Sequence, residues 1–192
     1  METVALNNHN TISKIQPQKF ALWIAMAGII MMFAALTSAY IVKKAAGDWL
    51  DFPLPPVFYY STLAMVLSSV TIQWSNYAYR RQHYRGYMAG LILTMALGLA
   101  FVIMQYQGWQ ELFRMGITIN ANVSGSFFYI ISGLHATHVL GGLAVLVVAL
   151  VHAISLPFRY TSRRHLRLDL TTQYWHFVDI LWLYLFFFLL IQ

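Results

Sequence analysis

Five apolar runs, each long enough to cross a membrane, constrain this chain more than any other feature. A transmembrane helix needs roughly 20 apolar residues to span a hydrocarbon core about 30 Å thick, and a helix satisfies its backbone hydrogen bonds without water. We therefore predict an all-α integral membrane bundle of five transmembrane helices, a single domain at 20–192 behind a polar segment at 1–19. The expected helices lie at about 20–42, 57–79, 87–109, 126–156 and 171–192.

The composition narrows the chemistry that the chain can carry. Charged residues make up 9% of the sequence, whereas soluble domains carry roughly 25%. Cysteine is absent, which excludes disulfides, thiolate metal sites and haem attachment through C-x-x-C-H. The formal charge of +6 does not indicate nucleic-acid binding, because the basic residues lie in short segments between the apolar runs. The polar N-terminal segment is unlike a signal peptide, so the first run is expected to be a true span.

The basic residues predict the orientation of the helices. Cytoplasmic segments of membrane proteins carry an excess of lysine and arginine, and the two sides of the five predicted helices differ strongly in this respect. We therefore predict a cytoplasmic N-terminus and a periplasmic C-terminus. The side of the N-terminus holds Lys14, Lys19, Arg80, Arg81, Arg85, Arg159, Arg163, Arg164 and Arg167, and the other side holds Lys43, Lys44 and Arg114.

Four ionisable side chains lie inside the last two apolar runs. They are His135 and His138 in "SGLHATHVLGG" and His176 and Asp179 in "YWHFVD". Such groups are costly at membrane depth and usually face protein or a polar cavity. At a rise of 1.5 Å per residue, His138 and Asp179 reach similar depths, which is compatible with a contact between the two helices through these groups but does not determine one.

Several interpretations of these groups compete. His138 and His152 are 14 residues apart, close to the spacing of a diheme helix, but the last run offers only His176 as a partner. His135, His138 and Asp179 would form a two-histidine, one-carboxylate metal set. The favoured interpretation is that these groups form hydrogen bonds between helices, or hold a lipid headgroup or a partner subunit. A transporter is a further alternative, although the interrupted helices typical of transporters are not found.

Small residues predict where the helices pack closely. Gly133, Thr137 and Gly141 recur every four residues beside Gly142, and a second strip lies on the first helix at 34–39. Small side chains let the backbones of membrane helices approach one another. Both strips, the second made of Ala34, Ala35, Ser38 and Ala39, are therefore expected to be packing faces.

Two segments carry a family resemblance. "YWHFVDILWLYLF" and "GSFFYIISGLHATHVLGG" resemble the signature segments of subunit III of the haem–copper cytochrome c oxidases. The similarity extends to "LPPVFYYSTLAMVLSSVTIQWS" and "FVIMQYQGWQEL", and together the matches cover most of 20–192. The chain resembles the five-helix form of the family, which lacks the first two of seven helices.

The resemblance implies an accessory subunit of a proton-pumping aa3-type oxidase in a bacterial cytoplasmic membrane. Such a subunit is non-catalytic and holds no cofactor or metal, because haem a and copper belong to subunits I and II. The implied partners are subunits I and II and membrane phospholipids, with a larger respiratory supercomplex left open. The implied role is to stabilise subunit I, to bind lipids and to support proton uptake. Subunit III of a quinol oxidase is the alternative.

Two positions depart from the family pattern, and both bear on the implied site. Gly28 and Ile29 stand where the family usually has Ser-Glu, so the membrane glutamate is absent. Asp169 stands where the family often has a glutamate, seven residues before His176, at the entrance to the predicted last helix. The candidate site residues, expected to act as structural, lipid-binding or subunit-interface groups, are His135, His138, Trp175, His176, Asp179 and Asp169.

Overall fold

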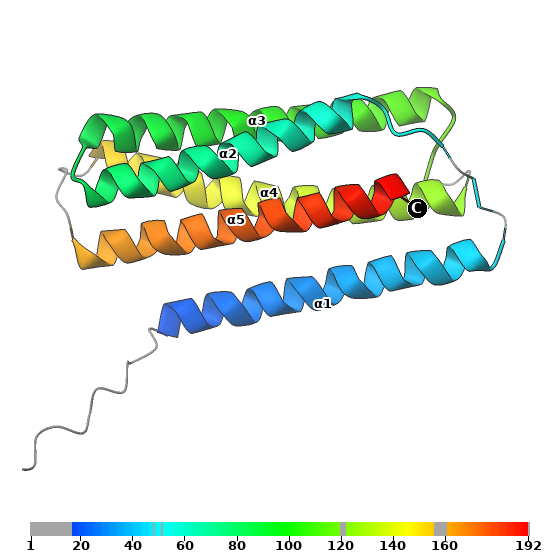
Figure 1. Cartoon of the computed structure of the whole chain (residues 1–192), viewed down its shortest axis with the longest axis horizontal. Coiled ribbons are helices and arrows are strands. Elements are labelled where there is room, and N and C mark those ends of the chain that lie inside the picture. Colours follow the sequence, from blue (N-terminus) through cyan, green and yellow to red (C-terminus); the bar gives the residue numbers. More distant parts are fainter. Residues whose placement is uncertain (1–16, 48, 51, 120–121, 156–160, 192) are drawn as a thin grey trace, which may run out of the picture.

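The computed structural model describes residues 17–191 except 48, 51, 120–121 and 156–160. The described residues form five α-helices and no strand, which confirms the predicted all-α class. The first sixteen residues of the expected polar segment lie outside the described part, as do Lys14 and Arg159 of the charge pattern. The helices are α1 (Pro17–Ala45), α2 (Val57–Arg80), α3 (Tyr84–Arg114), α4 (Val123–Ser155) and α5 (Ser162–Ile191) (Figure 1).

The helices are longer than the apolar runs predicted, and α5 differs most. It begins at Ser162, nine residues before the expected start at 171. The added turns, "SRRHLRLDL", are rich in charge but contain no helix-breaking residue. A helix of 30 residues is about 45 Å long, so its charged first turns can extend beyond a hydrocarbon core about 30 Å thick. Asp169 is therefore two turns inside α5 and not at its entrance.

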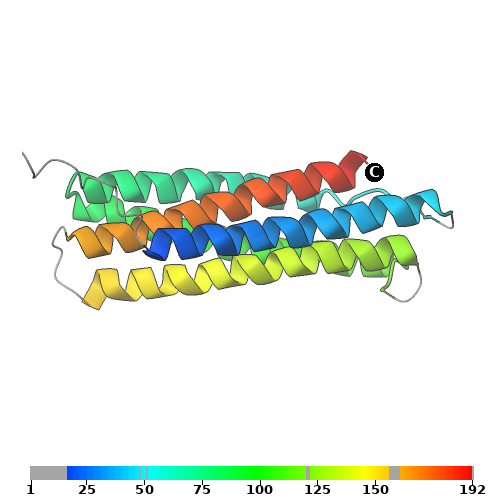
Figure 2. The ribbon, with the colours of Figure 1, turned by 90° about the horizontal axis from the view of Figure 1, so that it is seen from below.

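Four helices form the body of the bundle, and α1 lies along its edge. The antiparallel helices α2 and α3 pack along their whole length, α5 packs against α2 and α4, and α3 packs against α4. Helix α1 contacts only α4 and α5, and Figures 1 and 2 together show it below the groove between these two helices. Most of the surface of α1 is therefore open in this chain.

Four of the five helices are long and apolar enough to cross a membrane by length and composition. Helix α2 is not among them, because serine, threonine and amide side chains recur along it. Nearly all of these side chains face α3 or α5. The buried polar residues of α2 are Ser61, Ser68, Ser69, Ser75 and Asn76.

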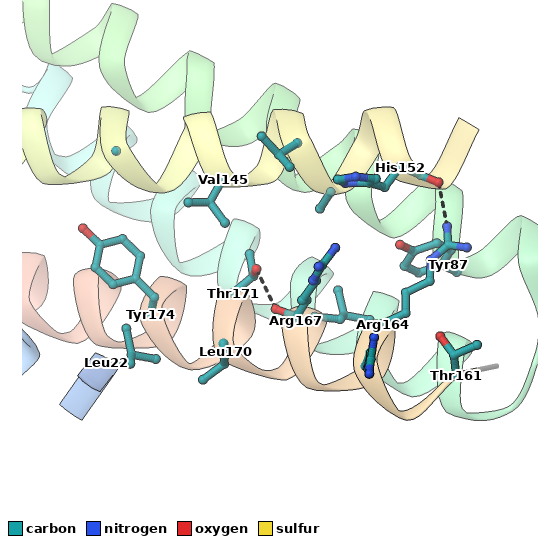
Figure 3. A pocket seen from close by; sticks show the side chains of 15 residues that line it. Leu22, Tyr87, Val145, His152, Thr161, Arg164, Arg167, Leu170, Thr171 and Tyr174 are labelled. Atoms are coloured by element: carbon teal, nitrogen blue, oxygen red, sulfur yellow. Dashed lines mark hydrogen bonds between the residues drawn. The ribbon is translucent and has the colours of Figure 1, made fainter. Parts of the chain in front are cut away.

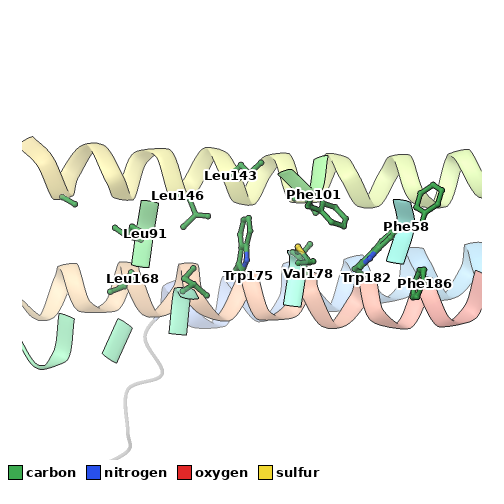
Figure 4. Close-up of a cluster of buried hydrophobic side chains, with 14 of the residues drawn as sticks. Phe58, Leu91, Phe101, Leu143, Leu146, Leu168, Trp175, Val178, Trp182 and Phe186 are labelled. Atoms are coloured by element: carbon green, nitrogen blue, oxygen red, sulfur yellow. The ribbon is translucent and has the colours of Figure 1, made fainter. Parts of the chain in front are cut away.

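Trp175 of α5 lies at the centre of the core. Its side chain is 1% exposed, and Figure 4 shows it projecting from α5 toward α4 beside Leu143 and Leu146. Glycines on two helices make room for the indole: a Cβ added at Gly98 of α3 would lie 2.9 Å from Trp175, and one at Gly142 of α4 would lie 3.1 Å from it. The ring thus fills the space between three helices.

The predicted packing faces are only partly right. Gly142 packs against Trp175, but no side chain or neighbouring backbone atom lies within 4 Å of a Cβ built at Gly133. The strip on α1 (Ala34, Ala35, Ser38 and Ala39) is exposed in the described structure. A close backbone approach occurs instead at Gly90 of α3, where an added Cβ would lie 2.6 Å from Cβ and 2.9 Å from Cα of Ser75. Small residues allow two helix backbones to approach closely, but their positions in the sequence do not identify the neighbouring helix.

Candidate functional site

A row of hydrogen bonds joins α5 to α2, and it contains two of the predicted site residues. The indole nitrogen of Trp175 donates to the hydroxyl of Ser68 at 2.9 Å. One residue further on, His176 Nδ1 lies 2.5 Å from the hydroxyl of Ser69. Two turns away, the indole nitrogen of Trp182 donates to Thr62 Oγ1 at 2.9 Å. Because the two helices are antiparallel, Trp175 and Trp182, seven residues apart on α5, meet residues six apart on α2.

Asp179 and Gln73 extend the contacts of His176. The carboxylate of Asp179 interacts with the Ser69 hydroxyl and with the His176 ring. On the other side of the ring, His176 Nε2 lies 3.1 Å from the Gln73 side-chain oxygen. The Asp179 side chain is 6% exposed, and its Oδ1 atom is buried without a hydrogen-bond partner among the described residues. We call Ser69, Gln73, His176 and Asp179 the α2–α5 polar cluster.

His135 lies in an aromatic cage on the other side of the core. Its ring is fully buried and lies 4.9 Å from the Trp182 ring and 5.9 Å from the Phe101 ring, centroid to centroid. Neither ring nitrogen has a hydrogen-bond partner among the described residues. With Phe33 at 6.4 Å, the aromatic neighbours come from α1, α3 and α5, so His135 of α4 connects four helices by packing.

His138 faces α1. Its ring packs edge to face against Phe33 at 5.8 Å, and its Nδ1 atom lies 2.7 Å from the Leu134 carbonyl oxygen of its own helix. The backbone oxygen of His138 accepts a hydrogen bond from Tyr174 of α5. Ile29 packs one turn before Phe33 in the same apolar cluster.

Asp169 joins three helices through charge. Its Oδ2 atom lies 3.1 Å from Lys19 Nζ of α1, and its Oδ1 atom lies 3.9 Å from an Arg80 guanidinium nitrogen of α2. The Gln173 amide also donates to Asp169, and Arg80 Nε donates to His165. These groups join the N-terminal parts of α1 and α5 to the C-terminal end of α2, and we call this end of the bundle the basic end.

The structure separates groups that the sequence placed at similar depths. His138 contacts Phe33 of α1, whereas Asp179 contacts Ser69 of α2, so the contact that their similar depths left undetermined is replaced by contacts with two different helices. His135, His138 and Asp179 do not converge. Within the described ranges, no three histidine, cysteine, aspartate or glutamate side chains lie close enough together to hold a metal ion.

A cavity between α4 and α5 was not predicted. Its volume is about 910 Å³, and Arg164 and Arg167 of α5 are among its lining residues (Figure 3). Apolar side chains such as Val145 and Val148 line one part, and Arg163 and Arg167 border the other. Arg164 reaches across the cavity and donates to the backbone oxygen of His152 at 3.0 Å. Because α5 begins at Ser162, Arg163 and Arg167 are one helical turn apart and lie on the same face of the helix.

The chain is similar to known oxidase subunits. A family model described as cytochrome c oxidase subunit III matches residues 51–191. Cytochrome c oxidase subunit 3 of Corynebacterium diphtheriae is 34% identical over 167 residues, which are 82% of this chain and 79% of that protein. The horse (Equus caballus) and chimpanzee (Pan troglodytes) subunits are each 32% identical over 126 residues, 66% of this chain. The chain spans about half the length of these mammalian relatives, since the matches cover 46% of each.

Proposed function

The chain belongs to the cytochrome c oxidase subunit III family, and from this membership we propose that it is the five-helix accessory subunit of a proton-pumping aa3-type oxidase in a bacterial cytoplasmic membrane. The observation that carries the proposal is the extent of the family match, which runs from residue 51 to 191 and takes in α2, α3, α4 and α5 completely. In this role the chain stabilises subunit I, binds lipids and supports proton uptake.

We assign the redox chemistry to the partner subunits. Haem a and copper would lie in subunits I and II, and this chain would hold no cofactor and perform no catalytic step. The local contacts of the candidate residues support this assignment: Trp175 and His176 bind α2 hydroxyls, and Asp169 pairs with Lys19. Each contact joins two helices of the same chain, which is the arrangement expected of groups that stabilise a bundle.

We propose that all five helices span the membrane, with the basic end at the cytoplasmic side. Helix α2 has a polar composition, but it packs along the whole of α3, and its buried polar side chains face α3 and α5. These polar groups are therefore shielded from lipid, which supports a span at α2. Lys19, Arg80 and Arg164 lie at the basic end, and Lys43, Lys44 and Arg114 end α1 and α3 at the other. The positive-inside rule then favours a cytoplasmic N-terminus.

The electron donor is tested by purifying the whole complex through a tag on this chain. We expect turnover with reduced cytochrome c, and a co-purified subunit II that contains the Cys/His/Met cluster of a copper site. Turnover with a quinol and not with cytochrome c, together with a subunit II that lacks the copper ligands, would instead establish the quinol oxidase alternative.

We propose that the cavity between α4 and α5 holds an anionic phospholipid. Its apolar wall at Val145 and Val148 matches an acyl chain, and Arg163 and Arg167 lie where the phosphate would reach the membrane surface. Arginine binds phosphate well because its planar guanidinium offers paired donors. Both arginine side chains are exposed, so they are accessible to a headgroup.

Removing both charges should weaken the binding of anionic lipid. Each basic residue near a membrane surface contributes about 1 kcal/mol to the attraction of anionic lipids, so Arg163→Gln with Arg167→Gln should lower the affinity for phosphatidylglycerol by about thirty-fold. The measurement is the phosphatidylglycerol retained per chain, by mass spectrometry, after exchange into detergent. The matched control, Lys43→Gln with Lys44→Gln, removes two charges at the opposite end and should retain the lipid. An equal loss in both double variants would refute the site.

A further inference from the structure

The α2–α5 polar cluster reaches the surface of the bundle at membrane depth. Gln73 is seven residues before Arg80 on α2, and His176 is seven residues after Asp169 on α5. At 1.5 Å per residue, both lie about 10 Å from the level of the ionic contacts at the basic end. The Gln73 side chain is exposed and the His176 ring is half-buried. A polar surface thus lies where lipid tails would otherwise surround the helices.

Most of the other polar side chains of α2 have partners inside the chain; the exception among the buried ones is Asn76, whose Oδ1 atom has no hydrogen-bond partner in the described part of the chain. Thr62 accepts from Trp182, Thr71 pairs with Thr94, and Ser75 donates to the Tyr87 backbone oxygen. Ser61 accepts from the Gln105 amide in the same way. Gln73 differs because its side chain is exposed, and its hydrogen-bond partner among the described residues is His176.

The hydrogen bonds of the cluster leave one group of the Gln73 amide unused. Asp179, Ser69, His176 and Gln73 form a continuous chain of polar contacts. If Ser69 donates to the Asp179 carboxylate, it accepts from His176 Nδ1. A neutral His176 then accepts through Nε2 from the Gln73 nitrogen, so the Gln73 oxygen is left unpaired. In the reversed arrangement Ser69 donates to His176 Nδ1, and His176 Nε2 donates to the Gln73 oxygen. The Gln73 nitrogen is then left unpaired. An amide has both donors and an acceptor, so either arrangement leaves a hydrogen-bonding group that faces outward.

We propose that this surface, centred on Gln73 and His176, binds a transmembrane helix of another oxidase subunit, and that this helix carries an amide, hydroxyl or imidazole side chain at the same depth. Lipid tails cannot satisfy an outward-facing amide, and polar side chains within membranes pair with other protein groups. Small and polar residues join membrane helices through such bonds. The proposal rests on the proposed function, since it requires that the chain works within an oxidase complex.

A photo-crosslinking experiment identifies what covers the surface. Val70 is 62% exposed and lies one turn from Gln73 on α2, so Val70→p-benzoylphenylalanine places a reactive ketone beside the cluster. The control is Leu93→p-benzoylphenylalanine on α3, which is 45% exposed. Leu93 lies at the same depth as Val70, because Thr71 and Thr94, the residues that follow them in the sequence, share a hydrogen bond. Both variants are irradiated in membranes that contain the complete oxidase, and the adducts are identified by mass spectrometry.

We expect the Val70 variant to form an adduct with another oxidase subunit, and the Leu93 variant to form little or none. An adduct with a second copy of this chain, with lipid alone, or with the same subunit equally from both positions would overturn the proposal. Co-purification of the unsubstituted chain with a haem-bearing subunit is scored separately. If that co-purification fails, the proposed function fails, whereas co-purification without a Val70 adduct overturns only this inference.

A second variant tests the amide itself. Gln73→Leu should increase the dissociation of the chain from the complex by about three-fold, and by up to about twenty-fold, in the range of measured hydrogen bonds between membrane helices. The control Gln107→Leu removes another exposed glutamine, on α3, and should leave dissociation unchanged. The readout is the fraction of chain retained with the haem-bearing subunit during detergent washing. A leucine facing lipid would be favourable, so unchanged or improved retention would contradict the proposal. The amount of chain in the membrane and its circular dichroism show whether the variant has folded.

Discussion

Replacing Trp175 by alanine should lower the free energy of unfolding of the chain by about 3–5 kcal/mol, the range for truncating a large buried aromatic residue. The indole is 1% exposed, fits against Gly98 of α3 and Gly142 of α4, and donates to Ser68 of α2. Its loss would therefore open a cavity where α5 meets three other helices. The measurement is unfolding in detergent, followed by far-ultraviolet circular dichroism as a denaturing detergent is added.

Two controls separate packing from the hydrogen bond. Trp175→Phe keeps most of the ring volume and should cost about 1–2 kcal/mol, mainly for the lost indole donor. Trp74→Ala removes a tryptophan that is 48% exposed and should change the stability by no more than about 0.5 kcal/mol. If Trp175→Ala were no more destabilising than Trp74→Ala, Trp175 would not have the central packing role that its contacts indicate.

Gly90→Ala should separate α2 from α3. The added methyl group would lie 2.6 Å from Cβ, 2.9 Å from Cα and 3.0 Å from N of Ser75, so part of the conflict is with backbone atoms that no rotamer change can move. Overpacking of this kind costs about 1–3 kcal/mol. The same unfolding measurement on the purified chain gives the size of the effect.

Gly28→Ala is the matched control, and it should change stability in the opposite direction. No side chain or neighbouring backbone atom lies within 4 Å of a Cβ built at Gly28, which is inside α1. Alanine is favoured over glycine in a helix interior by up to about 1 kcal/mol. Equal effects at the two positions would show that close approach at Gly90 does not limit the packing of α2 on α3.

The apolar runs predicted the helices well because hydrocarbon thickness and helical rise set the length of a span. The start of α5 was missed because the segment from Ser162 to Leu170 is charged, and hydropathy does not distinguish a charged helical turn from a loop. For the same reason, the arginines beside the α4–α5 cavity were not predicted to lie on one face of a helix. The signal that could have indicated them is a pair of arginines four residues apart, Arg163 and Arg167, just before the last apolar run.

The contacts of the candidate site could not be predicted in the same way. Depth follows from counting residues along a helix, and this count placed His138 and Asp179 at similar depths without determining whether they meet. Which neighbour a side chain faces depends also on the rotation of each helix, which is set by packing across the whole bundle. His138 therefore faces Phe33 of α1, and Asp179 faces Ser69 of α2. The close approach at Gly90 was missed for a related reason, since it needs Ser75 on another helix.

The central claim is that this chain supports redox chemistry performed by its neighbours, and an absorption spectrum with a metal analysis tests it most directly. The complex purified through a tag on this chain should show the Soret band of haem a and should contain copper. After the subunits are separated in detergent, the folded chain should retain neither, while both remain with the other subunits. A Soret band or stoichiometric copper that stays with the isolated chain would contradict the account.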